Sequence, residues 1–342
     1  MSQMNCVYDK PDDIKLSLKS QLCDLYVISG EFSVELLRFS ENYTFCVLEA
    51  VSGRKTVVRV SIPGYHDEEE FLGELIWMKE ISQETDIVLP RVIHGRNGEF
   101  IQKLKCTNSK KEYCCCMFSF LEGKPLKKLK GEELAYWMGK TGEVLAKLHI
   151  QSQNRNSTIE IKRFSWDIED LLGENARFGN WRDNKSLNAA QVQIIQRAVE
   201  KITDRVLLYG KSREKYGLIH ADLHCSNIIV DGDTMQIFDY DDCGYGYYLY
   251  DFGCSLVEYS DELENMADAL IKGYEKIRPL SNEEKAEVGT FILLRRIIRL
   301  AWLESHSESD TAKTVCSDYI AKTCRMSEEY VNGYSQLFLI DN

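Results

Sequence analysis

Four side chains suited to a metal-assisted site lie close together in the second half of the chain. Asp222 and Asn227 come first, and Asp239 and Asp241 follow shortly after them. Carboxylates that are crowded together repel one another, and burying them is costly unless a cation neutralises their charge. Oxygen ligands alone are typical of Mg²⁺ rather than Zn²⁺. This group of residues therefore favours magnesium chemistry.

The order of residues around this group predicts a β-hairpin. Two apolar runs, 227–230 and 235–238, flank the turn Asp231-Gly232-Asp233. An Asp-Gly pair between β-forming runs is a good hairpin signal. Because a tight hairpin brings its outer ends together, we expect Asn227 and Asp239 to be neighbours, with Asp222 arriving from the preceding loop.

The spacing of these residues matches the needs of phosphoryl transfer. That reaction uses an Asp that accepts a hydroxyl proton, an Asn and a second Asp that hold Mg²⁺, and a basic residue on the phosphates. Protein kinases carry H-R-D-x-x-x-x-N and then D-F-G. Here Ala221 replaces the Arg, and Tyr240-Asp241 follows Asp239, which points away from ordinary protein kinases. An acidic surface hairpin without chemistry is the alternative.

Three segments carry a resemblance to a known family. The chain reads HADLHCSN from residue 220, then IFDYDD, then YDFG. In this order they resemble the aminoglycoside phosphotransferase and choline kinase superfamily, whose signature is roughly H-G-D-L-H-x-x-N, I-D-F-x-D and Y-D-L-A. The bacterial subgroup with stress-response kinase A, homoserine-kinase-like and spectinomycin-phosphotransferase-like proteins is the most similar. The resemblance implies an α+β, protein-kinase-like fold of two lobes, with a small β-rich N-lobe and a larger, mostly helical C-lobe.

The resemblance also implies roles for the acidic residues. Asp222 is expected to be the catalytic residue, which orients and deprotonates the acceptor hydroxyl. Asn227 and Asp239 are expected to hold Mg²⁺. Asp241 is the remaining candidate metal ligand. It is expected either to bind a second metal ion or to bind a cationic acceptor.

Histidines near these residues are expected to be structural. His220 and His224 invite a metal or acid–base interpretation, but the kinase template makes the first a packing residue of the catalytic loop, and we expect the same of His224. His149 ends a predicted helix and is expected to cap or pack. Asp251 matches the aspartate of Y-D-L-A, which implies that it accepts backbone hydrogen bonds from the catalytic loop.

Before residue 119 the chain is rich in predicted strands. The patterns predict a helix over 12–26, strands at 35–39, 44–50 and 56–62, a helix over 67–81, and strands at 99–104 and 113–120. The first turn, 40–43, lies where a kinase-like lobe folds over nucleotide phosphates. It contains no glycine, so it is either a polar hairpin turn or a phosphate loop in which Asn42 approaches the nucleotide.

Arg59 is a charged residue inside the apolar strand VVRVSIPG, where it is costly unless paired. Kinase-like folds place a Lys here, between the nucleotide phosphates and a helix Glu. The resemblance implies that Arg59 contacts the phosphates. Glu74, beside the buried stripe of the next helix, is its expected partner; a solvated Glu is the alternative.

The pattern changes from strands to helices around residue 119. We therefore expect residues 1–118 to form a nucleotide-binding N-lobe, 119–123 a hinge, and 124–342 a helical lobe with the catalytic loop and acceptor site. Backbone groups of a hinge can pair with an adenine edge, so Ser119 and Leu121 are candidate nucleotide-binding residues. A plain exit from strand to loop is the alternative.

Helical spacing dominates the rest of the chain. A helix around 134–148 contains Gly139 and Gly142, which permit close packing. Further helices are predicted at 166–172, 189–208, 281–302 and 310–334. In the predicted helix at 281–302, Arg295, Arg296 and Arg299 are interpreted mainly as a solvated basic face, with phosphate binding as the alternative.

Composition narrows the class of protein. The net charge of −12 over 342 residues disfavours a nucleic-acid or anionic-membrane surface. No apolar run approaches the roughly 20 residues that a membrane helix needs, and no secretory signal is visible. The 12 cysteines contain no C-x-x-C pair. Reduced thiols in a cytoplasmic protein are the expectation.

The leading hypothesis is an ATP- and Mg²⁺-dependent phosphotransferase that moves the γ-phosphoryl group to a hydroxyl of a small molecule. An amino alcohol, an amino sugar or an aminoglycoside-like compound is the expected acceptor. A protein Ser/Thr kinase of the stress-response kinase A type and a catalytically silent nucleotide-binding module are the alternatives. Acceptor identity, ATP against GTP, and oligomeric state do not follow from the sequence.

Overall fold

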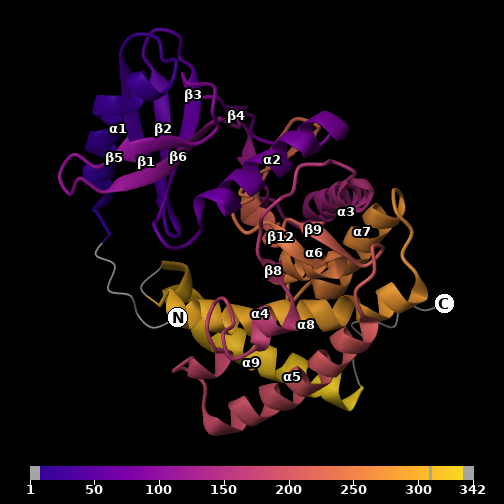
Figure 1. Cartoon of the computed structure of the whole chain (residues 1–342). Coiled ribbons are helices and arrows are strands. Elements are labelled where there is room, and N and C mark those ends of the chain that lie inside the picture. Colours follow the sequence, from indigo (N-terminus) through magenta and orange to yellow (C-terminus); the bar gives the residue numbers. More distant parts are fainter. Residues whose placement is uncertain (1–7, 308–309, 334–342) are drawn as a thin grey trace.

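The computed structural model describes residues 8–307 and 310–333. The chain forms a smaller lobe built on a β-sheet and a larger lobe of packed helices (Figure 1). The small lobe holds the N-terminal elements, drawn in indigo to magenta, and the large lobe holds the later ones. This is the two-lobed α+β architecture that the sequence predicts.

The small lobe is an antiparallel sheet with one helix against it. Its strands run in the order β1-β2-β3-β6-β4, and β5 also pairs with β6. The bounds are β1 Phe32–Phe39, β2 Asn42–Glu49, β3 Lys55–Ser61, β4 Val92–Ile93, β5 Gln102–Lys105 and β6 Glu112–Ser119. Helix α1, Pro11–Leu25, buries Ile14, Leu18 and Leu22 in the same apolar cluster as Phe45 and Val58 of the sheet.

Helix α2, Glu68–Glu84, connects the two lobes. It begins with a capping box in which the side chain of Asp67 accepts from the Glu70 N–H and the Glu70 side chain accepts from the Asp67 N–H. Its apolar face belongs to the core of the large lobe: the Trp77 ring lies edge-on to Tyr240 at 5.7 Å, and Trp77 Nε1 donates to Gln151. The core of the large lobe therefore includes side chains from a helix of the predicted N-lobe. The predicted lobe boundaries stay a prediction.

Seven α-helices form most of the described part of the large lobe. They are α3 Gly131–Asn154, α4 Ile168–Leu172, α5 Ala189–Tyr209, α6 Tyr248–Leu256, α7 Leu263–Glu275, α8 Asn282–Ser305 and α9 Asp310–Asn332. Helices α3 and α7 approach closely because they meet at glycines. A Cβ on Gly142 would lie 2.0 Å from the Leu270 carbonyl oxygen, and one on Gly273 would lie 1.8 Å from that of Gly139. The predicted close packing at Gly142 is confirmed.

Two small sheets position the loops of the site. The predicted hairpin is present as β10 Ile228–Asp231 and β11 Thr234–Ile237, and β10 also pairs with β7, Lys124–Pro125. The second sheet consists of β8 Ser165–Trp166, β12 Gly244–Tyr247 and β9 Tyr216–Ile219, in that order. Three 3-10 turns complete the lobe, at Leu126–Lys128, Trp181–Asp183 and Cys225–Asn227.

Several boundaries differ from the sequence-based expectation. The predicted helix at 166–172 starts later, since Trp166 is the second residue of β8. The ten cysteines whose side chains the structure describes form no disulfide. Within the described ranges, no helix combines the length and the apolar character that crossing a membrane requires.

Candidate functional site

A cavity of about 480 Å³ lies between the lobes and collects most of the predicted site residues. Asn42 and Arg59 line it from the small lobe, and Asp222, Asn227 and Asp239 line it from the large lobe. Asp241 lines it as well. Ser119 and Leu121 are not among the lining residues; Ser119 instead exchanges hydrogen bonds with Arg91, and nucleotide binding at the hinge stays a prediction.

The loop that carries Asp222 is held by Asp251, from α6. The Asp251 carboxylate accepts hydrogen bonds from the N–H groups of His220 and Ala221 at 3.1 and 2.7 Å, as expected of this residue. Nε2 of His149 lies 3.1 Å from the same carboxylate. Ala221 has a φ of 64°, a left-handed conformation that is costly for a residue with a Cβ. The buried Asp251 carboxylate offsets that strain by fixing the amide groups of His220 and Ala221.

Asp222 faces the cavity with a fixed side chain. Arg295 donates to its Oδ1 at 2.6 Å, Asn227 Nδ2 donates to its Oδ2 at 3.1 Å, and His224 Nε2 lies 3.5 Å from Oδ2. Burial alone would raise the pKa of Asp222, but His224 and Arg295 hold it well below its usual range. Burial alone would lower the pKa of His224, but Asp222 raises it to about 10. His224 is thus a charged partner of Asp222 and not only the packing residue that was expected.

The hairpin brings the two ends of its strands together as predicted. The Phe238 N–H donates to the Asn227 carbonyl at 3.1 Å, and Asp239 follows directly. Asp239 has a φ of 67°, and its carboxylate lies 3.6 Å from Arg38 of β1. Burial raises the pKa of Asp239 to about 6, and Asp241 and Asp222 add to that rise. Burial and the two neighbouring carboxylates therefore outweigh the effect of Arg38 and Arg59 on this group.

Asp241 is engaged by three groups of the small lobe. Asn42 Nδ2 donates to it at 2.8 Å, Arg59 Nη1 lies at 3.5 Å, and His66 Nε2 lies at 3.5 Å. Burial alone would raise the pKa of Asp241, but Arg59 and His66 lower it. In this conformation Asp241 joins the lobes, and its role as a metal ligand stays a prediction.

Arg59 and Glu74 form the ion pair that was predicted. Two parallel hydrogen bonds, of 2.9 and 2.5 Å, join the guanidinium to the carboxylate. Both side chains are buried. Burial alone would lower the pKa of Arg59, but Glu74 and Asp241 raise it well above its usual range. A solvated Glu74 is therefore excluded, and Arg59 keeps a fixed charge at the edge of the cavity.

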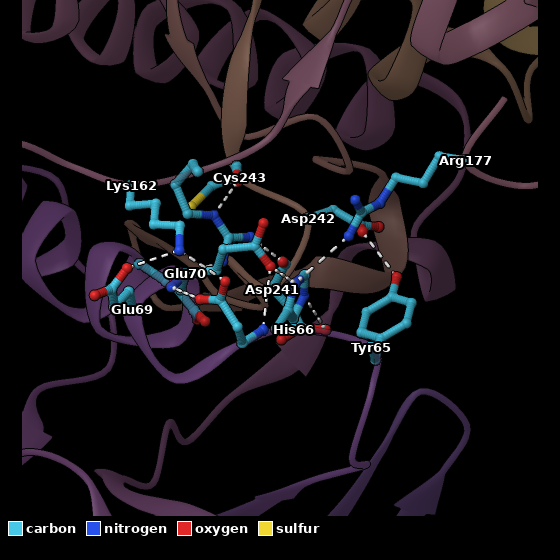
Figure 2. Close-up of polar contacts among 12 residues, drawn as sticks. Tyr65, His66, Glu69, Glu70, Lys162, Arg177, Asp241, Asp242 and Cys243 are labelled. Atoms are coloured by element: carbon cyan, nitrogen blue, oxygen red, sulfur yellow. Dashed lines mark hydrogen bonds and ion pairs between the residues drawn. The ribbon is translucent and has the colours of Figure 1, made fainter. Parts of the chain in front are cut away.

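The loop between β3 and α2 meets the segment that follows Asp239 (Figure 2). The Tyr65 hydroxyl donates to Asp242 Oδ1 at 3.1 Å, and His66 lies between Glu70 and Asp241. Arg163, not predicted as a site residue, donates to the backbone carbonyls of Glu70, Asp241 and Cys243. The segment 241–243 is therefore held against the start of α2.

The interpretation of α8 as carrying a solvated basic face is wrong. Arg296 is buried and donates to Val257 O and Thr323, because α6 and α9 cover this side of the helix. Arg295 and Arg299 line the cavity instead, with 12% and 15% of their side chains exposed. Arg299 pairs with Glu258 at 3.4 Å.

Sequence reasoning missed other residues that line the cavity. Glu41 pairs with His306 at 3.2 Å and accepts from Trp302 Nε1, so it links the β1–β2 turn to α8. Asp242 directly follows the predicted ligand Asp241, and the double aspartate was the available signal. Burial raises the pKa of Asp242 to about 7, with contributions from Asp222 and Asp241.

Comparison with known proteins agrees with this geometry. Residues 35–287 match the Phosphotransferase enzyme family. The chain belongs to this family. The resemblance seen in HADLHCSN, IFDYDD and YDFG is thereby confirmed, and the protein is a kinase-type phosphotransferase with an alcohol group as acceptor.

The phosphotransferase has relatives with several named activities. Amicoumacin kinase of Bacillus subtilis (strain 168) is 21% identical over 282 residues, or 78% of this chain and 79% of that protein. The structure of the microcompartment-associated aminopropanol kinase is 29% identical, with a TM-score of 0.82, over 92% of this chain and 97% of that one. Amicoumacin kinase hAmiN, in complex with AMP-PNP, Ca²⁺ and Ami, superposes with a TM-score of 0.70 at 19% identity. The superposition covers 95% of this chain and 94% of that chain. These structures confirm the protein-kinase-like fold.

Proposed function

We propose that this phosphotransferase moves the γ-phosphoryl group of ATP to the hydroxyl of a small amine-bearing alcohol and requires Mg²⁺. The observation that carries the proposal is that Asp222, Asn227 and Asp239 face one cavity between the lobes, opposite Arg59. ATP as co-substrate is supported by nucleotide complexes of structural neighbours, and an amino alcohol is supported by the name of the aminopropanol kinase.

Asp222 has the geometry of the residue that activates the acceptor. Arg295 and Asn227 fix its carboxylate, and Arg295 and His224 keep it ionised, so it can accept the hydroxyl proton. As the acceptor oxygen forms its bond to the γ-phosphorus, the bond from that phosphorus to the bridging oxygen breaks and ADP leaves. Arg59 carries a permanent charge toward the phosphates, because Glu74 and Asp241 hold its guanidinium in place.

The residues around Asp239 fit a divalent cation. The Nδ2 group of Asn227 points to Asp222, which leaves its Oδ1 as a ligand beside the Asp239 carboxylate. Burial and two neighbouring carboxylates raise the pKa of Asp239 to about 6 in spite of Arg38, so a bound cation would stabilise its ionised form. When bound, Mg²⁺ would neutralise the phosphate charge that develops during transfer.

The decisive experiment is an ADP-release assay with a panel of acceptors. Purified protein, ATP and Mg²⁺ are combined with 1-amino-2-propanol, ethanolamine, homoserine or spectinomycin, with and without EDTA. One amino alcohol should support turnover that EDTA removes, and Asp222→Asn should reduce kcat by about 10²–10⁴-fold. ATP should still raise the Tm of that variant.

The other outcomes decide among the alternatives. Full turnover by Asp222→Asn would overturn the role given to this residue. Labelled phosphate that appears on protein, and not on any small acceptor, would favour a protein Ser/Thr kinase. No ATP consumption with any acceptor would favour a catalytically silent nucleotide-binding module.

A further inference from the structure

All but one of the acidic side chains that line the cavity have a basic side chain close by. Five acidic residues each have an arginine or histidine side chain within 4.0 Å: Glu41, Asp222, Asp239, Asp241 and Glu258. Asp242 also lines the cavity, and among the side chains that the structure describes, those of residues 8–307 and 318–333, no cationic group lies that close to its carboxylate. The Tyr65 hydroxyl, which is neutral, donates to it at 3.1 Å.

We propose that Asp242 binds the protonated amine of the acceptor and thereby selects amino alcohols over neutral alcohols. This inference rests on the proposed function. A carboxylate that faces a cavity without a cationic partner gains most from a ligand that brings the positive charge, since the ion pair then forms with little competition from the protein.

The negative charge of Asp242 favours the acceptor over the nucleotide as the ligand of this residue. A triphosphate is repelled by an uncompensated carboxylate, whereas an ammonium group is attracted by it. Phe178 and Trp302 line the same cavity and provide aromatic surface beside a cationic group. Because Asp222 shares the cavity with Asp242, one compact molecule can place its hydroxyl at the former and its amine at the latter. The shared cavity therefore favours acceptors that carry both a hydroxyl and an amine.

Two local contacts offer a structural explanation for the presence of an aspartate at position 242. Figure 2 shows Arg177 near it, but that guanidinium stacks on Phe164, with its central carbon 3.4 Å from the ring centroid, and Nη2 lies 3.5 Å from His66. The contact with Tyr65 joins the lobes, so Asp242 has a structural use as well. A purely structural residue would affect all acceptors equally, and an acceptor-binding residue would not.

The test compares two acceptors that differ in a single group, 1-amino-2-propanol and propane-1,2-diol. Wild-type protein should prefer the amine on the order of 100-fold in kcat/KM, because the diol leaves the half-buried carboxylate of Asp242 unpaired. Asp242→Asn, which keeps the shape of the side chain, should reduce this ratio at least on the order of tenfold. Asp242→Glu should retain more of the ratio than Asp242→Asn.

A matched control removes one negative charge from a position outside the cavity. Asp233 is exposed in the β10–β11 turn, outside the cavity, and Asp233→Asn should keep the wild-type ratio. An equal ratio in wild type and Asp242→Asn would overturn the inference, as would a wild-type enzyme that uses both acceptors equally well. If amino alcohols are phosphorylated but the ratio is independent of Asp242, only this inference fails. If no amino alcohol is phosphorylated at all, the proposed function fails with it.

Discussion

Arg295 Nη2 donates to Asp222 Oδ1 at 2.6 Å, although the two residues are 73 positions apart in the sequence. The other arm of the guanidinium, Nη1, donates to the Tyr250 hydroxyl at 3.2 Å. The fork of Arg295 therefore connects α8 and α6 to the catalytic loop. It fixes the direction of the Asp222 carboxylate and, after His224, contributes to keeping that group ionised.

Replacing Arg295 should therefore slow the chemical step more than it weakens ATP binding. We expect Arg295→Met to lower kcat by about 10²-fold, since an activating carboxylate that is poorly oriented loses much of its effect. Arg295→Lys keeps the charge without the fork and should recover only part of the rate. Steady-state kinetics with ATP varied would show this as a change in kcat. An unchanged kcat in Arg295→Met, with intact folding, would contradict it.

Variants of the buried pair Arg59 and Glu74 should have different effects on the stability of the fold and on ATP binding. Arg59→Met leaves the Glu74 carboxylate buried without its partner, so we expect a loss of about 3–5 kcal/mol in the free energy of unfolding. The double variant Arg59→Met/Glu74→Leu removes both charges and should regain much of that stability. It should still bind ATP poorly, because the charge toward the phosphates is gone. Denaturant unfolding and nucleotide titration measure the two effects.

If the double variant recovers both stability and ATP affinity, Arg59 has only a structural role. If it recovers neither, the packing around the pair, and not its charge, dominates. The single variant Arg59→Lys is the charge-conserving control, and it should keep more ATP affinity than Arg59→Met.

How much of the site follows from the sequence depends on how local its contacts are. Asn227 and Asp239 were expected as neighbours because one hairpin joins them, and Asp-Gly at its turn fixes the pairing. Arg59 and Glu74 were matched because a charge in an apolar strand must find a partner on the adjacent helix.

Long-range contacts were not predictable in this way. The periodicity of α8 does not reveal that the side of the helix with Arg296 is covered by α6 and α9, so its arginines were interpreted as solvated. Similarly, Tyr65 and Asp242 meet only because the β3–α2 loop packs on the segment after Asp239. Neither residue carries a local signal for that contact.

The packing of α3 against α7 gives a prediction with a control on the same helix. A Cβ at Gly142 would overlap the Leu270 carbonyl and lie 2.7 Å from the Tyr274 nitrogen, so α7 would have to move. We expect Gly142→Ala to lower the free energy of unfolding by about 1–3 kcal/mol. A Cβ at Gly139 would meet the Ala269 carbonyl at an ordinary 3.5 Å. Gly139→Ala should therefore be neutral or stabilise by up to about 1 kcal/mol. Thermal unfolding of the two variants compares them directly, and equal losses would argue against close packing at Gly142.

The contact between Glu41 and His306 should make the stability of the fold depend on pH. Burial alone would lower the pKa of His306, but the hydrogen bond with Glu41 raises it above its ordinary 6.5. Burial alone would raise the pKa of Glu41, but His306 and Ser40 lower it from 4.5 to about 2. The histidine contribution is complete below pH 6.5 and is lost as pH rises through its raised pKa, and the glutamate contribution is lost as pH falls below 4.5. The pair should stabilise the fold most between these values.

A double-mutant cycle with Glu41→Gln and His306→Gln measures this coupling without the other effects of either substitution. We expect a coupling free energy of about 1 kcal/mol at pH 5.5, since both side chains are partly exposed, and a smaller value at pH 9, where more of the histidine is neutral. The turn that holds Glu41 precedes Asn42 in the cavity, so loss of the pair should also raise the KM for ATP at the lower pH. A coupling energy that is the same at both pH values would show that the contact is not an ion pair, and its contribution would then come from the Trp302 hydrogen bond and packing alone.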